Sequence, residues 1–309
     1  MPASPIRLAL VVPTKDRPED LAKLLASLAA QTRRPAQLIV VDGSDPAVKG
    51  VCDAAQGLKV DYVREFPPSL AAQRNAGMRQ LRADITHAGY LDDDIVLEPD
   101  AIEQMLRAWE RVGADVGGVG FNITNRPRPS WLWLKRLFLI EGAEPGLMLR
   151  SGFASSFFVD ERDLETDWLS GGATVWRREV IDHYAYDNWF SGTGLLEDVD
   201  YSYNVRGAWR LRVASAARLA HYSHPIRPER EFLLGKWQIV NRMYLVRKYR
   251  DRGLSLPLAW WAGAWLFLLH LVAAAAKLDA HFWNRARGNL AGLFAELGGR
   301  RERVGGHLK

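Results

Sequence analysis

Short apolar runs alternate with helical patterns along the first 125 residues of the chain. Runs at 6–12, 37–42, 59–63 and 87–92 have the length and apolar character of buried strands. After the first run, Pro18 suits a first helical turn, and the leucines recur at i, i+3, i+4 and i+7, at positions 21, 24, 25 and 28. Further helices are expected near 45–56, over 69–82 and after Pro99. This order predicts an α/β fold with a mostly parallel sheet flanked by helices.

The middle of the chain is less regular. Residues 126–165 have no clear period and are rich in Pro, Gly and aromatic residues. Order returns at 168–181, where a strand pattern runs into a helix, and 190–209 places Glu197 and Asp198 at the start of a helix. Residues 210–225 predict short strands that end at His221 and His224.

The pattern changes again near residue 230. Residues 230–252 form a basic amphipathic helix pattern, and 254–276 are 23 residues without a formal charge. That length suffices to cross a bilayer. We therefore predict two regions, a catalytic α/β domain at 1–228 and a basic, apolar helical region at 229–309 that associates with a membrane.

Composition, charge and the N-terminal run add further constraints. The net charge of +5 and pI near 9.3 favour anionic partners. The single cysteine, Cys52, excludes an internal disulfide. The N-terminal apolar run is too short for a signal peptide, so we expect the N-terminal part to stay in the cytoplasm. The basic residues gather around an apolar helix rather than among stacking aromatics, so no nucleic-acid partner is predicted.

Polar residues follow three of the predicted strands. Residues 14–17, 42–45 and 92–94 come directly after them, and ligands of parallel sheets bind beyond these strand ends. Asp92, Asp93 and Asp94 repel one another unless they are solvated or neutralised. They are either a wet turn or oxygen ligands for a hard divalent cation.

The ordered segments LVVPTKDRPEDLAKLLASLAAQ, IVVDGSD, RNAG, YLDDDI and, about a hundred residues later, GTGLLEDVDY resemble family 2 of the inverting glycosyltransferases. The resemblance covers roughly residues 6–225. It implies the GT-A fold, which is Rossmann-like, a nucleotide-diphosphate sugar as donor, and Mn²⁺ or Mg²⁺ as cofactor.

The same resemblance assigns the site residues. It places the donor on Pro13, Thr14, Asp16, Arg17, Asp42, Ser44, Arg74, Asn75, Asp92, Asp93, Gly171 and Gly172. It places the metal on Asp92 and Asp94, and we add His224, although His221 fits the motif equally well. In the triplet, Asp93 supports the turn and is the member that the metal does not need.

Each assignment has a structural alternative. Asp42 could cap a helix or form an Asx-turn, and Arg74 could lie on an exposed helix face. Gly171 and Gly172 could serve only tight packing, and a lone histidine is more often structural.

The resemblance makes Asp198 the general base that takes the proton of the acceptor hydroxyl, with Glu197 orienting or contacting the acceptor. The alternative is an acidic first turn that the helix dipole favours. Asp200 is assigned to the helix face. Trp189 and Phe190 could stack on an acceptor sugar or pack in the core.

Both flanks of 254–276 are basic, so neither is expected to be translocated. We therefore prefer an in-plane or re-entrant anchor on the cytoplasmic leaflet over a single span. A buried helical hairpin or an oligomer interface is the alternative. Residues 130–140, with Trp131 and Trp133, are expected to dip into the same interface or to gate the acceptor site.

The sequence thus predicts a metal-dependent inverting glycosyltransferase at the cytoplasmic face of the membrane. Its partners are a nucleotide-diphosphate sugar, a glycan acceptor that is lipid-linked, and membrane lipids. A polyprenyl-phosphate glycosyltransferase and a non-catalytic nucleotide-sugar-binding scaffold are the alternatives. A nucleotidylyltransferase is disfavoured because PTKDRPED lacks the glycines of its phosphate loop.

Overall fold

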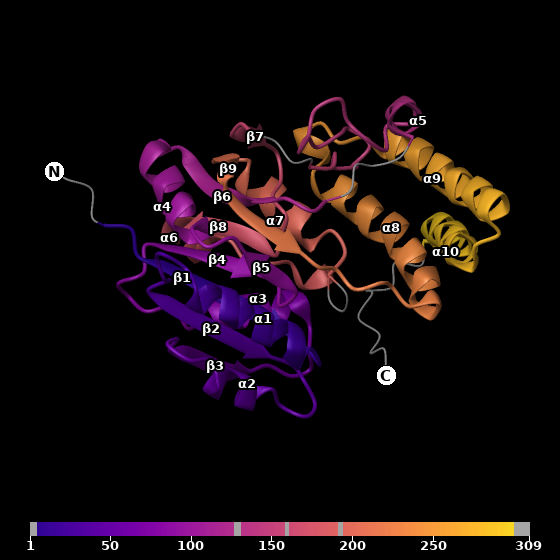
Figure 1. Cartoon of the computed structure of the whole chain (residues 1–309). Coiled ribbons are helices and arrows are strands. Elements are labelled where there is room, and N and C mark those ends of the chain that lie inside the picture. Colours follow the sequence, from indigo (N-terminus) through magenta and orange to yellow (C-terminus); the bar gives the residue numbers. More distant parts are fainter. Residues whose placement is uncertain (1–4, 127–130, 158–160, 191–193, 300–309) are drawn as a thin grey trace. The chain divides into compact units, whose positions relative to one another are not determined.

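The structure is a computed structural model that describes residues 5–126, 131–157, 161–190 and 194–299 (Figure 1). The chain folds into two compact units. Among the described residues, the first unit holds 5–126 and 161–223, and the second holds 131–157 and 224–299.

The first unit contains the predicted parallel sheet. Strands β1 (Leu8–Thr14), β2 (Gln37–Asp42), β3 (Val60–Arg64) and β4 (His87–Leu91) lie in the order β3-β2-β1-β4, and each neighbouring pair is parallel. All residues of β1, β2 and β4 are buried, as continuous apolar strands between two helical layers must be. These four strands confirm the predicted strands, whose ends they match to within two residues.

The other half of the sheet is mixed. Strand β8 (Ala173–Arg177) runs antiparallel to both β4 and β6 (Val116–Ile123). Strand β9 (Arg210–His221) is parallel to β6, and β5 (Ile95–Leu97) and β7 (Leu164–Thr166) pair with it antiparallel. The short strands predicted at 210–225 are one continuous strand.

Strand β6 was not predicted, because three glycines interrupt its apolar pattern. A Cβ on Gly118 would lie 2.4 Å from the ring of Trp176 on β8. The glycines therefore make room for a large neighbouring side chain, a requirement that only the paired strand reveals.

Helices cover both faces of this sheet. On one face Leu10 and Val12 of β1 pack with α1 (Pro18–Ala29) and α4 (Ala101–Arg111). On the other face Val11 packs with α3 (Leu70–Met78), α6 (Arg178–His183) and α7 (Glu197–Val205). This alternation follows from the two-residue period of a strand. The short helices are α2 (Lys49–Asp53) and a 3₁₀ turn at Asn188–Phe190.

The second unit is helical. It contains α5 (Leu132–Leu137), α8 (Pro228–Lys248), a 3₁₀ turn (Arg250–Arg252), α9 (Leu256–Lys277) and α10 (Ala280–Leu297). Helices α8 and α10 approach closely, since a Cβ on Gly288 would lie 2.0 Å from the carbonyl oxygen of Phe232. Phe138, which follows α5, stacks on Trp265 of α9 with a ring-centroid distance of 3.8 Å.

The domain prediction differs from this division in one respect. The second unit begins at 224, close to the predicted boundary at 228/229, but it also includes 131–157. Those residues were assigned to the catalytic domain by their place in the chain. Their apolar side chains instead pack on the C-terminal helices.

Candidate active site

The acidic triplet follows β4 and turns the chain into β5. The Asp92 N–H donates to the carbonyl of Gly172 at 3.0 Å, which fixes the turn against the segment before β8. The side chain of Asp92 is 27% exposed, whereas those of Asp93 and Asp94 are buried. The three carboxylates therefore have different surroundings, and a uniformly solvated turn is excluded.

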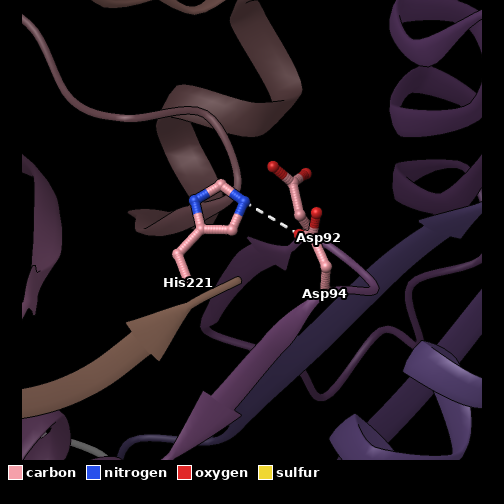
Figure 2. A group of neighbouring side chains, drawn as sticks. All are labelled: Asp92, Asp94 and His221. Atoms are coloured by element: carbon pink, nitrogen blue, oxygen red, sulfur yellow. Dashed lines mark ion pairs between the residues drawn. The ribbon is translucent and has the colours of Figure 1, made fainter. Parts of the chain in front are cut away.

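Asp92, Asp94 and His221 form a cluster with metal-ligand geometry. One ligand atom from each lies within 4.8 Å of the other two, and Figure 2 shows the imidazole beside the two carboxylates. His221 Nε2 lies 2.8 Å from Asp94 Oδ1. Burial would lower the pKa of His221, but its hydrogen bond to Asp94 and the charge of Asp92 outweigh burial and raise it. Two carboxylates and an imidazole fit Mn²⁺, and the carboxylates also suit Mg²⁺.

The structure therefore favours His221 over His224 as the third ligand. His221 ends β9, and its backbone N–H donates to Asn125 Oδ1 at 2.9 Å. His224 is exposed, lies beyond the strand and belongs to the second unit. His224 is not part of this cluster, because it lies three residues beyond the end of β9. His221 is at the strand end, where its side chain lies beside the two carboxylates.

Asp93 is an anchor rather than an expendable residue. Thr14 Oγ1 donates to its Oδ2 at 2.7 Å, and Arg17 Nη1 donates to its Oδ1 at 3.1 Å. Burial raises the pKa of Asp93 to about 6, although Arg17 opposes the shift. Asp93 thus ties the end of β4 to the end of β1. Contact of Asp93 with the donor stays a prediction.

Arg74 joins the two acidic motifs. Its side chain is 1% exposed, its Nη2 lies 3.1 Å from Asp92 Oδ1, and its Nη1 lies 2.9 Å from Glu197 Oε1. The ring of Tyr186 lies 5.2 Å from the guanidinium carbon. The exposed helix face considered for Arg74 is therefore excluded. A guanidinium suits this place because its planar fork donates in two directions and stays charged.

Glu197 and Asp198 begin α7 beside this arginine. Asp198 Oδ2 accepts from the Gly171 N–H at 3.1 Å, and Oδ1 accepts from the Val199 N–H at 2.8 Å. Glu197 Oε2 has no hydrogen-bond partner among the described residues. Burial and the charge of Asp198 raise the pKa of Glu197 to about 8, against the opposing effect of Arg74. Burial also raises the pKa of Asp198, but its two N–H donors favour the carboxylate.

The two glycines before β8 leave no room for a side chain. A Cβ on Gly172 would lie 2.0 Å from the Asp92 carboxylate, and a Cβ on Gly171 would lie 2.6 Å from Arg74 Nη1. The backbone at these two glycines therefore lies close to the side chains of Asp92 and Arg74. Contact of these glycines with the donor stays a prediction.

Asp42 organises a loop. Its carboxylate accepts from the N–H groups of Ser44 at 2.7 Å and Val48 at 2.9 Å, from the Tyr62 hydroxyl, and from Arg64 Nη1 at 3.0 Å. Its side chain is fully buried. The Asx-turn considered for Asp42 is therefore present. Contact of Asp42 with the donor stays a prediction.

The predicted donor residues after β1 interlock with this loop. Ser44 Oγ accepts from the Asp16 N–H at 2.8 Å, and Asp16 Oδ1 accepts from the Asp45 N–H at 3.0 Å. Thr14 and Ser44 are buried, whereas Asp16 is exposed and the side chain of Arg17 is 41% exposed. Of this group, Asp16 and Arg17 present atoms to solvent at the strand ends.

Asn75 has a partner in the protein. Its Nδ2 donates to the Tyr186 carbonyl at 3.2 Å, and its Oδ1 accepts from the Tyr186 N–H at 3.1 Å. This pair holds Tyr186 over Arg74. The neighbouring Gln73 donates to the carbonyls of Thr14 and Val41, both at 2.9 Å, and so joins the ends of β1 and β2.

Arg126 is a site residue that the sequence did not reveal. Its Nη2 donates to Ser170 Oγ at 2.6 Å, directly before the two glycines. Burial lowers its pKa, and the charges of Asp198 and Asp92 oppose that shift. Its place follows from β6, the strand that was not predicted, so no signal in the sequence placed it at the site. The neighbouring Asn125 accepts from the His221 N–H, as described above, and its Nδ2 donates to the His221 carbonyl at 2.9 Å.

Comparison with known proteins assigns the fold. Residues 9–184 match the model of the family described as glycosyl transferase family 2. No curated protein sequence matches the chain.

Solved structures share this fold at low sequence identity. The mannosyltransferase PcManGT from Pyrobaculum calidifontis, in complex with GDP-Man and Mn²⁺, has a TM-score of 0.59 at 15% identity, over 97% of this chain and 89% of that one. S. aureus TarS has a TM-score of 0.50 at 14% identity, over 91% of this chain, and this chain spans 55% of TarS. TarS 1-349 in complex with UDP has a TM-score of 0.51 at 14% identity, over 98% of this chain and 93% of that one.

Proposed function

The chain belongs to glycosyl transferase family 2, and from this premise we propose that it transfers a sugar from a nucleotide-diphosphate donor to a glycan hydroxyl with inversion. One observation carries the proposal. Two acidic motifs a hundred residues apart meet across the buried Arg74, which contacts Asp92 on one side and Glu197 on the other. Such a site can hold a diphosphate-linked sugar beside a carboxylate base.

The donor side uses the cluster of Asp92, Asp94 and His221. These residues would hold Mn²⁺ or Mg²⁺, which would neutralise charge on the leaving diphosphate. Arg17 presents a cation at the same strand ends. PcManGT and TarS 1-349 were solved with GDP-Man and UDP, which supports a nucleoside-diphosphate sugar as the donor.

The acceptor side uses Asp198. Its carboxylate takes the proton from the acceptor hydroxyl as the acceptor oxygen bonds to the anomeric carbon. The bond from that carbon to the diphosphate oxygen breaks, and the electron pair leaves with the nucleoside diphosphate. Attack opposite the leaving group inverts the anomeric configuration.

The environments of the two neighbouring carboxylates separate their roles. Glu197 is buried, and its raised pKa keeps it protonated at neutral pH. Asp198 accepts two backbone N–H bonds, which favour the ionised form that a base requires. Glu197 therefore positions Arg74 and the acceptor, and Asp198 is the base.

The acceptor in this proposal is a lipid-linked glycan at the cytoplasmic membrane face. Helix α9 supports membrane association. Among the described residues it alone is long and apolar enough to cross a membrane. Arg126 favours a second candidate acceptor, polyprenyl phosphate, because it brings a cation to the neighbourhood of Asp198.

The test replaces the base. Asp198→Asn should lower the transfer rate by ~10²–10⁴ while Mn²⁺-dependent binding of the nucleotide sugar remains. The measurements are product formation and calorimetric donor binding. Transfer at the wild-type rate, or loss of donor binding together with transfer, would rule out Asp198 as the base. Polyprenyl phosphate and a lipid-linked glycan, tested side by side as acceptors, separate the two candidate functions.

A further inference from the structure

The outward face of α9 is apolar along its length. Six of its exposed side chains recur every three or four residues and so share one face of the helix: Pro257, Trp261, Ala264, Leu268, Val272 and Ala275, here named the α9 stripe. Trp261, Leu268 and Val272 are 48%, 39% and 53% exposed. Single exposed apolar residues are ordinary, but a continuous stripe marks an interaction site.

The neighbouring helices of the same unit extend this apolar character. Helix α10, which packs against α9, exposes Trp283, Leu290, Phe294 and Leu297, which are seven, four and three residues apart and each between 37% and 70% exposed. Near α5, Trp131, Trp133 and Leu137 are between 49% and 72% exposed. Exposed tryptophans beside aliphatic residues are typical of segments at a membrane–water interface.

The charge of the unit indicates which partner covers the stripe. Residues 131–157 and 224–299 carry fourteen Lys and Arg against seven Asp and Glu. Because the whole chain carries +5, the remainder is net negative, and the positive charge is concentrated in the unit that holds the stripe. Exposed Arg250 and Arg252 precede α9, and exposed Lys277 ends it. An apolar stripe with basic residues at both ends matches a bilayer with anionic headgroups.

The opposite face of α9 packs inside the protein. Ala259, Ala262, Gly263, Leu266 and Ala274 are buried. His270 Nδ1 lies 2.6 Å from Asn289 Oδ1 on α10, and Asn289 Nδ2 donates to the Gly235 carbonyl on α8 at 2.8 Å. If α9 crossed the bilayer as packed here, α10 would enter the hydrocarbon with Arg285 and Arg287, which is costly.

We propose that α9 lies in the plane of an anionic lipid surface, with the α9 stripe in the acyl boundary and the buried face packed on α8 and α10. The inference rests on the proposed function only in that a membrane would present the acceptor. The helix lies on one leaflet, and the side chains of the α9 stripe enter the lipid.

The first test measures binding of the full chain to vesicles. Wild-type protein should float with phosphatidylglycerol vesicles, and less so with phosphatidylcholine vesicles or at high salt. Leu268→Glu combined with Val272→Glu should lower the partition coefficient by roughly tenfold or more, because it removes apolar burial and adds charge. Phe66→Glu, at a side chain 54% exposed in the first unit, is the matched control and should bind as wild type does.

Two results of this test would overturn the proposal. One is a double variant that binds vesicles as well as the Phe66→Glu control does. The other is a wild type that does not float but forms a dimer that the double variant loses, since a second copy would then cover the stripe. Mn²⁺-dependent donor binding is measured in parallel and should be unchanged in the double variant. Failure of the proposed function and failure of the docking surface are therefore distinguishable.

The second test separates an in-plane helix from a span. Arg252→Cys and Lys277→Cys are made singly in a Cys52→Ala background, which removes the native thiol. With protein bound to the outside of sealed vesicles, a membrane-impermeant maleimide should label both positions equally. Protection of position 277 until detergent is added would show that α9 crosses the bilayer and would overturn the in-plane assignment.

Discussion

At the scale of single residues, the site depends on acidic side chains that contact one buried arginine. Arg74 is buried between Asp92 and Glu197. Because Glu197 is protonated at neutral pH, removal of Asp92 would leave the charge of Arg74 poorly compensated, whereas removal of Glu197 would leave its Nη1 without this hydrogen-bond acceptor. The side chains of Asp92 and Arg74 fill the space beside Gly172 and Gly171. The glycines, the arginine and the acids therefore form one arrangement in which each member limits the size of its neighbours.

Gly172→Ala tests this packing. Its Cβ would lie 2.0 Å from Asp92 Cγ, so the carboxylate must move away from the metal cluster. We expect Mn²⁺ affinity, measured by calorimetry, to fall by roughly tenfold or more, which corresponds to ~1.4 kcal/mol.

Gly50→Ala is the matched control. Gly50 lies in α2, where an added Cβ would meet nothing within 4 Å. It should leave Mn²⁺ binding unchanged and raise stability by ~0.5–1 kcal/mol, because alanine favours helices. Equal Mn²⁺ affinities in the two variants would contradict the role assigned to Gly172.

The raised pKa of Glu197 predicts that the stability of the folded protein depends on pH. Its pKa is raised from 4.5 to about 8 in the folded protein, mainly by burial. Between these values the folded state keeps a proton that the unfolded state releases, so this group lowers the free energy of unfolding as pH rises.

The measurement compares wild type with Glu197→Gln by urea unfolding at several pH values. The stability of wild type relative to the variant should fall as pH rises from 5 to 8, since glutamine has no proton to lose. A difference that stays constant over this range would show that the pKa of Glu197 is not raised.

At the scale of elements, the site is assembled where strand ends are tied together. Asp93 joins the end of β4 to Thr14 and Arg17, Gln73 joins the ends of β1 and β2, and Asn125 holds the end of β9 at His221. These residues set the spacing between elements that carry the donor and metal ligands. They support the site without being predicted ligands of the metal.

Asp93→Asn tests the tie between β4 and β1. The amide keeps the size of the side chain but loses the charge that faces Arg17. We expect the free energy of unfolding to fall by about 1–3 kcal/mol, while Mn²⁺ affinity stays within about threefold. Asp94→Asn, which removes a predicted ligand, is the comparison and should lose most Mn²⁺ affinity. Unchanged stability with lost Mn²⁺ binding in Asp93→Asn would make Asp93 a ligand instead.

At the scale of the whole molecule, the chain leaves the first unit after residue 126 and returns to it at 161, having contributed a segment to the second unit. That segment needs the C-terminal helices. Phe138 stacks on Trp265, Gly152 lies against Val246, and the Arg150 carbonyl accepts from the Ser255 N–H at 2.8 Å. Cutting the chain at the apparent boundary therefore exposes apolar surface on what remains.

Two fragments test this organisation. Residues 1–228 should be poorly soluble or should be cleaved within 131–157, because the partners of that segment are missing. The same fragment with 128–157 replaced by a short Gly/Ser linker should be more soluble and should resist protease. The measurements are soluble yield and limited proteolysis. Equal behaviour of the two fragments would contradict the assignment of 131–157 to the helical unit.

The sequence by itself determined the parallel half of the sheet, its covering helices and the acidic motifs. Buried strands and amphipathic helices leave a local period, and Leu21, Leu24, Leu25 and Leu28 were recognised and are all buried. The order of the motifs indicated the family, which the match over 9–184 confirms. Local pattern suffices for features that one segment specifies through its own residues.

Only the tertiary structure decided which side chains meet. His221 rather than His224 lies beside Asp92 and Asp94, and Arg74 is buried between the two acidic motifs. Asp42 accepts hydrogen bonds from its own loop, and Arg126 contacts Ser170. The tertiary structure also joined 131–157 to the C-terminal helices. The physical reason is that these outcomes depend on contacts between distant segments. Such contacts are set by strand pairing and side-chain volume, as at the glycines of β6, and they leave no period in the local sequence.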